Sequence, residues 1–134
     1  MTIREIFLER DYNCAEAVLL WANEWYGLRV APEDVALVSG FGGGLGCGEN
    51  CGALLGALSA LSKMTVAERA HATPNFKEVC AGLVDRFRGD LGSIQCTELK
   101  EKYRRPDVRC LYVVERAAAV LDEYVQTLEK NHDR

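Results

Sequence analysis

Cysteine is the residue type that this sequence holds in excess and places where it could do chemistry. The 134 residues include six cysteines and two histidines. Because the cytosol keeps thiols reduced, excess cysteine in a cytosolic chain indicates metal binding or catalysis more often than structural disulfides. The alternative is that the cysteines are buried thiols that act as small hydrophobic residues.

Four of the cysteines fall in the first turns of predicted helices. Each lies one or three residues after a residue that can cap a helix: Cys14 after Asn13, Cys51 after Asn50, Cys96 after Ser93 and Cys110 after Asp107. The first turn of a helix has free backbone N–H groups and the positive end of the helix dipole, and both favour a thiolate. The placement therefore predicts lowered cysteine pKa values.

A glycine-rich loop over residues 40–48 precedes Cys51 and contains Cys47. Glycine allows positive φ angles and a close approach of the backbone to a ligand, and successive N–H groups can form a nest for an anion. The candidate cofactor-contacting glycines are Gly42, Gly43, Gly44 and Gly52, although tight helix packing explains glycines equally well. Nucleotide-binding loops do not fit, because no Lys-Ser/Thr pair follows the glycines and no predicted strand precedes them.

The remaining thiols and imidazoles give weaker signals. Cys47 and Cys51 have C-x3-C spacing and could be disulfide partners or co-ligands. Cys80 shares an apolar helical stripe with residues 76, 79, 83, 84 and 87, which predicts a core thiol. His71 and His132 form no metal-ligand pair, and the sequence has no C-x-x-C-H motif for covalent haem attachment.

The apolar spacing predicts an all-α fold, a compact bundle of about five to six helices around the glycine-rich loop, in one domain over residues 1–134. A short helical turn is expected near Ile3 and Phe7. Longer helices are expected over residues 13–27, 51–64 and 76–92 and from 107 onward, and short helices over residues 32–39 and 93–99. No alternating pattern predicts a strand, and no internal repeat is present.

Charge and hydropathy exclude several classes of function. The 16 basic and 20 acidic residues give a net charge of −4, which argues against a nucleic-acid footprint. The apolar helical run over residues 51–61 is well short of the ~20 residues that span a bilayer. No secretory signal pattern is visible after Met1, so a cytoplasmic location is expected.

The segments NCAEA (residues 13–17), GFGGG (40–44) and CGALLG (51–56), with two later cysteines, resemble the C_GCAxxG_C_C family of redox-active proteins. The resemblance covers nearly the whole chain. Position by position, the four defining cysteines of the family correspond to Cys14, Cys51, Cys96 and Cys110, whereas Cys47 and Cys80 lie outside that set. A related domain accompanies haem-binding sequence in some cytochromes, but this chain lacks the haem motif.

Three functions follow. In the first, a thiol-dependent oxidoreductase or electron-transfer protein, Cys51 attacks and Cys14, Cys47, Cys96 or Cys110 resolves a mixed disulfide. In the second, Cys14, Cys51, Cys96 and Cys110 ligate an iron–sulfur cluster or zinc. In the third, the cysteines are structural in a non-catalytic binding module. The sequence names no redox partner and leaves a homodimer open.

Overall fold

A computed structural model describes residues 1–132, which form five α-helices and four short helical turns. The helices are α1 (Cys14–Tyr26), α2 (Gly52–Thr65), α3 (Phe76–Leu91), α4 (Cys96–Tyr103) and α5 (Leu111–His132). The turns are η1 (Glu5–Glu9), η2 (Pro32–Phe41), η3 (Gly44–Gly48) and η4 (Ala70–Ala72). Residues 1–132 contain no strand, only two isolated β-bridges. The all-α prediction is confirmed.

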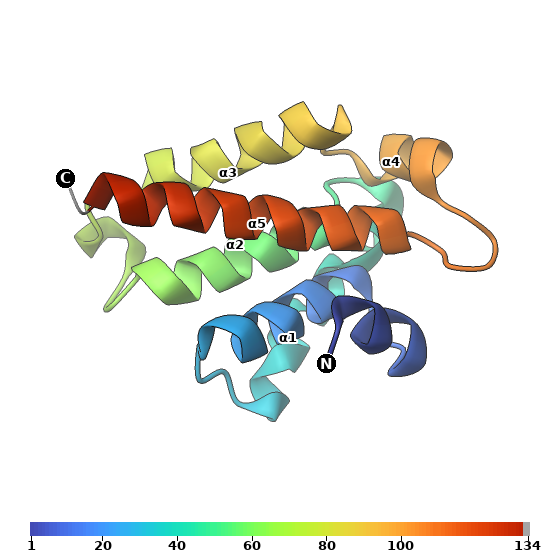
Figure 1. Ribbon diagram of the computed structural model, residues 1–134, viewed down its shortest axis with the longest axis horizontal. Coiled ribbons are helices and arrows are strands. Elements are labelled where there is room, and N and C mark those ends of the chain that lie inside the picture. The colour runs from blue at the N-terminus through green and yellow to red at the C-terminus, as the bar shows by residue number, and fades with distance from the viewer. Residues whose placement is uncertain (133–134) are drawn as a thin grey trace.

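The helices are arranged so that several of them begin at one end of the bundle. In Figure 1, α1, α2 and α5 start at the same end, beside the short α4, and α3 runs in the opposite direction. Fully buried side chains from the four long helices form one hydrophobic core, which includes Val18, Leu54, Leu61, Leu83, Phe87, Val114 and Leu121. Within residues 1–132, no helix combines the length and apolarity needed to cross a bilayer.

Helix α1 has the boundaries that its sequence predicts. The backbone N–H of Glu16 donates to the Asn13 side chain (3.0 Å), and the backbone N–H of Asn13 donates to the Glu16 carboxylate (2.9 Å). This capping box fixes the helix start directly before Cys14. Gly27 ends the helix in the left-handed conformation that glycine adopts without a steric penalty.

Three other predicted caps are wrong. Asn50 does not cap α2, because Cys51 is itself the N-cap residue and Asn50 instead accepts a hydrogen bond from the Gln95 side chain (3.2 Å). Gln95 also takes the N-cap position of α4, while the Ser93 hydroxyl accepts from the Gln95 backbone N–H in the preceding turn. Asp107 lies in a turn that comes before α5.

Helices α1 and α2 approach each other closely because α2 presents glycine at the contact. A Cβ added to Gly56 would lie 2.5 Å from the carbonyl oxygen of Ala15 and 3.0 Å from its Cα. Such distances leave no room for a side chain. Gly56 therefore explains one fixed position of the C-G-A-x-x-G pattern through packing.

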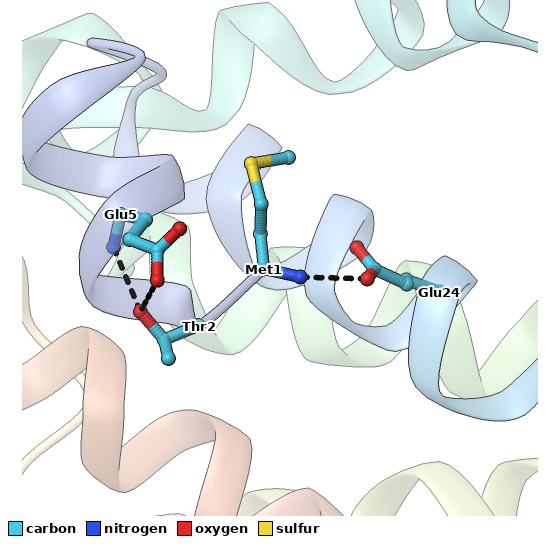
Figure 2. Close-up of polar contacts among 4 residues, drawn as sticks. All are labelled: Met1, Thr2, Glu5 and Glu24. Carbon is cyan, nitrogen blue, oxygen red and sulfur yellow. Dashed lines mark hydrogen bonds and ion pairs between the residues drawn. The ribbon is translucent and has the colours of Figure 1, made fainter.

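The N-terminal residues are held against α1 by polar contacts (Figure 2). The Glu5 backbone N–H donates to the Thr2 hydroxyl (3.1 Å), which donates in turn to the Glu5 carboxylate (3.2 Å). The Met1 ammonium pairs with the Glu24 carboxylate at 2.7 Å. These contacts position η1, whose Ile6 and Phe7 are buried against the core.

Candidate functional site

Four cysteines that are far apart in the sequence line one small cavity of about 50 Å³. We call it the four-thiol cavity; its lining residues are Cys14, Cys51, Cys96 and Cys110, with Gly43, Gly52, Leu99, Lys100 and Val113. Cys14 and Cys96 are the first residues of α1 and α4, and Cys51 is the N-cap of α2. Cys110 directly precedes α5, and its carbonyl accepts the Val114 N–H. The convergence of helix starts in Figure 1 brings these thiols together.

A single antiparallel β-bridge between Asn50 and Gln95 ties together the two segments that carry Cys51 and Cys96. The backbone N–H of Cys51 donates to the carbonyl of Ile94 (2.7 Å), and that of Cys96 donates to the carbonyl of Glu49 (2.7 Å). The bridge thus joins the residues that directly precede Cys51 and Cys96. Because both bonds use the backbone, they fix the two cysteines without consuming their sulfur atoms.

The Cys14 sulfur lies against the start of α2 at a point where only glycine fits. A Cβ on Gly52 would lie 2.5 Å from Cys14 Sγ and 2.6 Å from the carbonyl oxygen of Phe41. Gly52 therefore makes room for the Cys14 sulfur, which gives a physical reason for the glycine that follows Cys51 in the motif.

The four glycines expected to contact a cofactor divide into two groups. Gly43 and Gly52 line the four-thiol cavity, and Gly43 has no neighbour within 4 Å of an added Cβ. Gly42 instead packs directly on the side chain of Asn13. Gly44 has a positive φ of 65°, and an added Cβ would lie 2.5 Å from Cys96 Cβ. Gly42 and Gly44 therefore act in packing.

Arg109 anchors the segment that carries Cys110 to the N-terminal part of the chain. Its guanidinium donates to the carbonyl oxygen of Phe7 (2.8 Å) and lies 4.5 Å above the centroid of the Phe7 ring. It also pairs with Asp11 at 3.4 Å. This anchor holds the neighbouring Cys110 at the start of α5.

Burial raises the pKa of Cys51, Cys96 and Cys110, contrary to the lowering expected from their places at helix starts. Desolvation raises the pKa of Cys51 to about 12, and the backbone N–H groups of Leu54 and Ala53 lower it by less. The Cys51 side chain does not form a capping hydrogen bond with the first turn of α2. Burial also raises the pKa of Cys96 and of Cys110. Desolvation outweighs the helix N-terminus because removal of a charge from water costs more than two N–H groups recover.

Cys14 is a neighbour of the other three cavity thiols, because all four line the same cavity. Burial is the largest cause of the raised pKa of Cys51, Cys96 and Cys110, and a negative charge on Cys14 raises each of these pKa values further. Cys14 is half-buried, whereas Cys51 and Cys96 are only 5% and 7% exposed. Cys14 is thus both a shared neighbour and more accessible than these two thiols.

Lys100 is the residue of this site that sequence reasoning missed. Among residues 1–132 it is the only Lys, Arg, His, Asp or Glu side chain that lines the cavity, and its ammonium offsets part of the rise that burial causes in the pKa of Cys96 and of Cys110. Arg104 lowers the pKa of Cys110 as well. The sequence does contain one indication of Lys100, because a residue four positions after Cys96 lies on the same face of a helix.

Two cysteines lie outside the cavity. Cys47 is exposed in η3, and its thiol donates to the carbonyl of Gly44 at 3.8 Å. Cys80 is half-buried on α3 and is absent from the core cluster, so the prediction of a core thiol is wrong. Burial raises the Cys80 pKa.

The thiols are all free, and their positions are not those of a preformed metal centre. None of the six cysteines forms a disulfide. Among residues 1–132, no group of three or more His, Cys, Asp or Glu side chains could hold a metal ion as it stands. Ligation of an iron–sulfur cluster or zinc by the four cavity cysteines therefore stays a prediction.

The fold and the cavity together define a class, that of small all-helical proteins in which helix starts bring four thiols to one point. The chain belongs to the family described as "Putative redox-active protein (C_GCAxxG_C_C)", whose profile matches residues 12–124. This confirms the resemblance that the motifs suggested. Neither the curated proteins nor the solved structures gave a match to the chain.

Proposed function

We propose that this protein is a thiol–disulfide redox protein whose reacting groups are the cysteines of the four-thiol cavity. The observation that carries the proposal is that four cysteines from separate elements line one cavity of about 50 Å³. Thiols that line one small cavity are candidates for disulfide formation, which requires Cβ atoms about 3.5–4.5 Å apart. Membership of a family described as redox-active agrees with this chemistry.

Within the cavity we assign the attack to Cys14 and the resolution to Cys51. Cys14 is half-buried and is the first residue of α1, whereas Cys51 is nearly inaccessible and burial raises its pKa to about 12. The thiolate is the nucleophile in exchange, so a buried thiol with so high a pKa is a poor first attacker. This assignment reverses the roles expected from the sequence.

The reaction has two steps. The Cys14 thiolate attacks one sulfur of a partner disulfide, forms a mixed disulfide and releases the first partner thiolate. The Cys51 thiol then gives up its proton and attacks the Cys14 sulfur, which releases the second partner thiolate and leaves a Cys14–Cys51 disulfide. The protein gives up two electrons and two protons, and the partner disulfide becomes two thiols.

Disulfide mapping tests this assignment. Reduced protein is treated with diamide, unreacted thiols are blocked, and peptides are identified by mass spectrometry. We expect a Cys14–Cys51 disulfide that is absent in Cys14→Ser and in Cys51→Ser but still forms in Cys47→Ser. Oxidation that pairs other cavity cysteines would overturn the assigned roles, and a cavity that stays reduced under every oxidant would overturn the function.

The same four thiols are a donor set for the cluster alternative, because iron–sulfur clusters and structural zinc both take four cysteine ligands. Absorption spectroscopy of anaerobically purified protein separates this alternative from the disulfide. A visible band that disappears in Cys96→Ser would favour the cluster. If the cavity thiols neither oxidise nor bind iron or zinc, the result favours the third function, a non-catalytic binding module with structural cysteines.

A further inference from the structure

We propose that Lys100 and Arg104 form an anion-recognition site at the mouth of the four-thiol cavity, and that this site selects a carboxylate-bearing disulfide of low molecular mass. The proposal rests on the proposed function, because it names the class of disulfide that the cavity thiols would reduce. It assigns specificity to two residues that lie outside the cysteine motif.

The spacing of α4 places both cations on the face that carries Cys96. Lys100 follows Cys96 by one helical turn, and Arg104, the C-cap residue, follows Lys100 by another. Residues four apart lie on one side of a helix, and their side chains lean toward the helix N-terminus. Lys100 therefore leans toward the end of α4 that lines the cavity, and Arg104 follows it one turn farther from that end. Lys100 reaches the cavity lining itself.

Neither cation is neutralised by a carboxylate. Both residues are exposed, and in the part of the chain that the structure describes neither forms an ion pair. Arg109, by contrast, is engaged by Asp11 and Phe7. The charges also reach the thiols, because Lys100 and Arg104 both lower the pKa of Cys110.

The surrounding sequence strengthens the positive potential. Residues 100–109 contain five basic and two acidic residues, in a chain whose net charge is −4. A local basic patch on an acidic protein attracts anions to that place and repels them elsewhere. The potential at the cavity mouth therefore favours an anionic reactant.

The size of the cavity limits which part of that reactant can enter. A volume of about 50 Å³ admits a sulfur atom and its nearest carbons, and the lining beside the thiols includes the apolar Leu99 and Val113. Carboxylates would remain outside, at the level of Lys100 and Arg104. Guanidinium binds carboxylate through paired hydrogen bonds, and ammonium binds it as a point charge.

The test compares an anionic with an uncharged disulfide. Reduced protein is mixed with 5,5′-dithiobis(2-nitrobenzoate), a dianion, or with 4,4′-dithiodipyridine, and oxidation of the cavity cysteines is followed by rapid quenching and mass spectrometry. We measure the ratio of the two rates in Lys100→Gln, Arg104→Gln and the double variant. A lower ratio reports anion recognition, because a change in thiol ionisation alters both rates together.

Lys102→Gln is the matched control. It removes the same charge from the same helix, but the Lys102 ammonium lies 5.1 Å from the centroid of the Tyr103 ring and does not line the cavity. Two unit charges about 6 Å apart in water interact enough to change a rate about threefold. We expect about a threefold lower ratio in each single variant, about tenfold in the double variant, and a smaller decrease in Lys102→Gln, whose charge adds only to the general potential.

The outcomes separate this inference from the proposed function. If wild-type protein forms no cavity disulfide with either reagent, the proposed function fails. If wild-type protein does form the disulfide, but the rate ratio in the double variant equals that in Lys102→Gln, anion recognition is overturned and the redox function stands. Lys100→Arg keeps the charge and should keep the ratio, so a loss there as large as in Lys100→Gln would also overturn the inference.

Discussion

The alanine substitution Gly52→Ala tests whether this glycine exists to make room for the Cys14 sulfur. The added Cβ would lie 2.5 Å from Cys14 Sγ, 2.6 Å from the carbonyl oxygen of Phe41 and 3.1 Å from the Cα of Gly42. Two of these neighbours are backbone atoms, so the strain cannot be relieved by rotation of one side chain. Overpacking of this kind costs about 1–3 kcal/mol, and the higher helix propensity of alanine offsets less than about 1 kcal/mol of that.

Urea denaturation measures the effect, and Gly89→Ala is the matched control. Gly89 lies inside α3 with no atom within 4 Å of an added Cβ, so its replacement should stabilise the protein by about 0.5–1 kcal/mol. For Gly52→Ala we expect a loss of about 1–2 kcal/mol and slower formation of the Cys14–Cys51 disulfide. If Gly52→Ala were as stabilising as the control and oxidised at the wild-type rate, the steric reasoning would be refuted.

Two further predictions concern stability. Asn13→Ala removes the capping box of α1 and should lower the free energy of unfolding by about 1 kcal/mol in urea titrations; an unchanged midpoint would contradict the role of the cap. Arg116 binds Asp90 at 2.8 Å and lowers the pKa of that carboxyl, so the pair stabilises the fold above the unfolded carboxyl pKa of about 4 and loses this effect as pH falls through the folded value. The stability difference between wild type and Asp90→Asn should therefore shrink from pH 7 to pH 2.5, and a difference that is constant with pH would count against the ion pair.

The site illustrates how two effects on a thiol compete. Cys51 occupies the N-cap position of a helix, where the dipole and the N–H groups of Ala53 and Leu54 favour the thiolate. Its side chain is also nearly inaccessible to water, and this desolvation raises its pKa to about 12. A helix start activates a cysteine only where the sulfur keeps enough contact with water or with a cation.

The sequence alone was sufficient for features that depend on neighbouring residues. Asn13 and Glu16 form the predicted capping box, Gly27 ends α1, and the apolar stripe of α5 faces the core. Cys14 and Cys96 lie in the first turns of helices as predicted, whereas Cys51 is an N-cap residue and Cys110 precedes its helix. These features follow from backbone geometry within one or two helical turns.

Only the tertiary structure decided what depends on distant residues. Asn50 looked like a helix cap but pairs with Gln95, forty-five positions further along, and Cys80 sits on an apolar stripe yet stays outside the core. The meeting of the four thiols, and the burial that raises the pKa of Cys51, result from the way separate helices pack. Desolvation depends on every element that covers a group, so no local pattern of residues contains it.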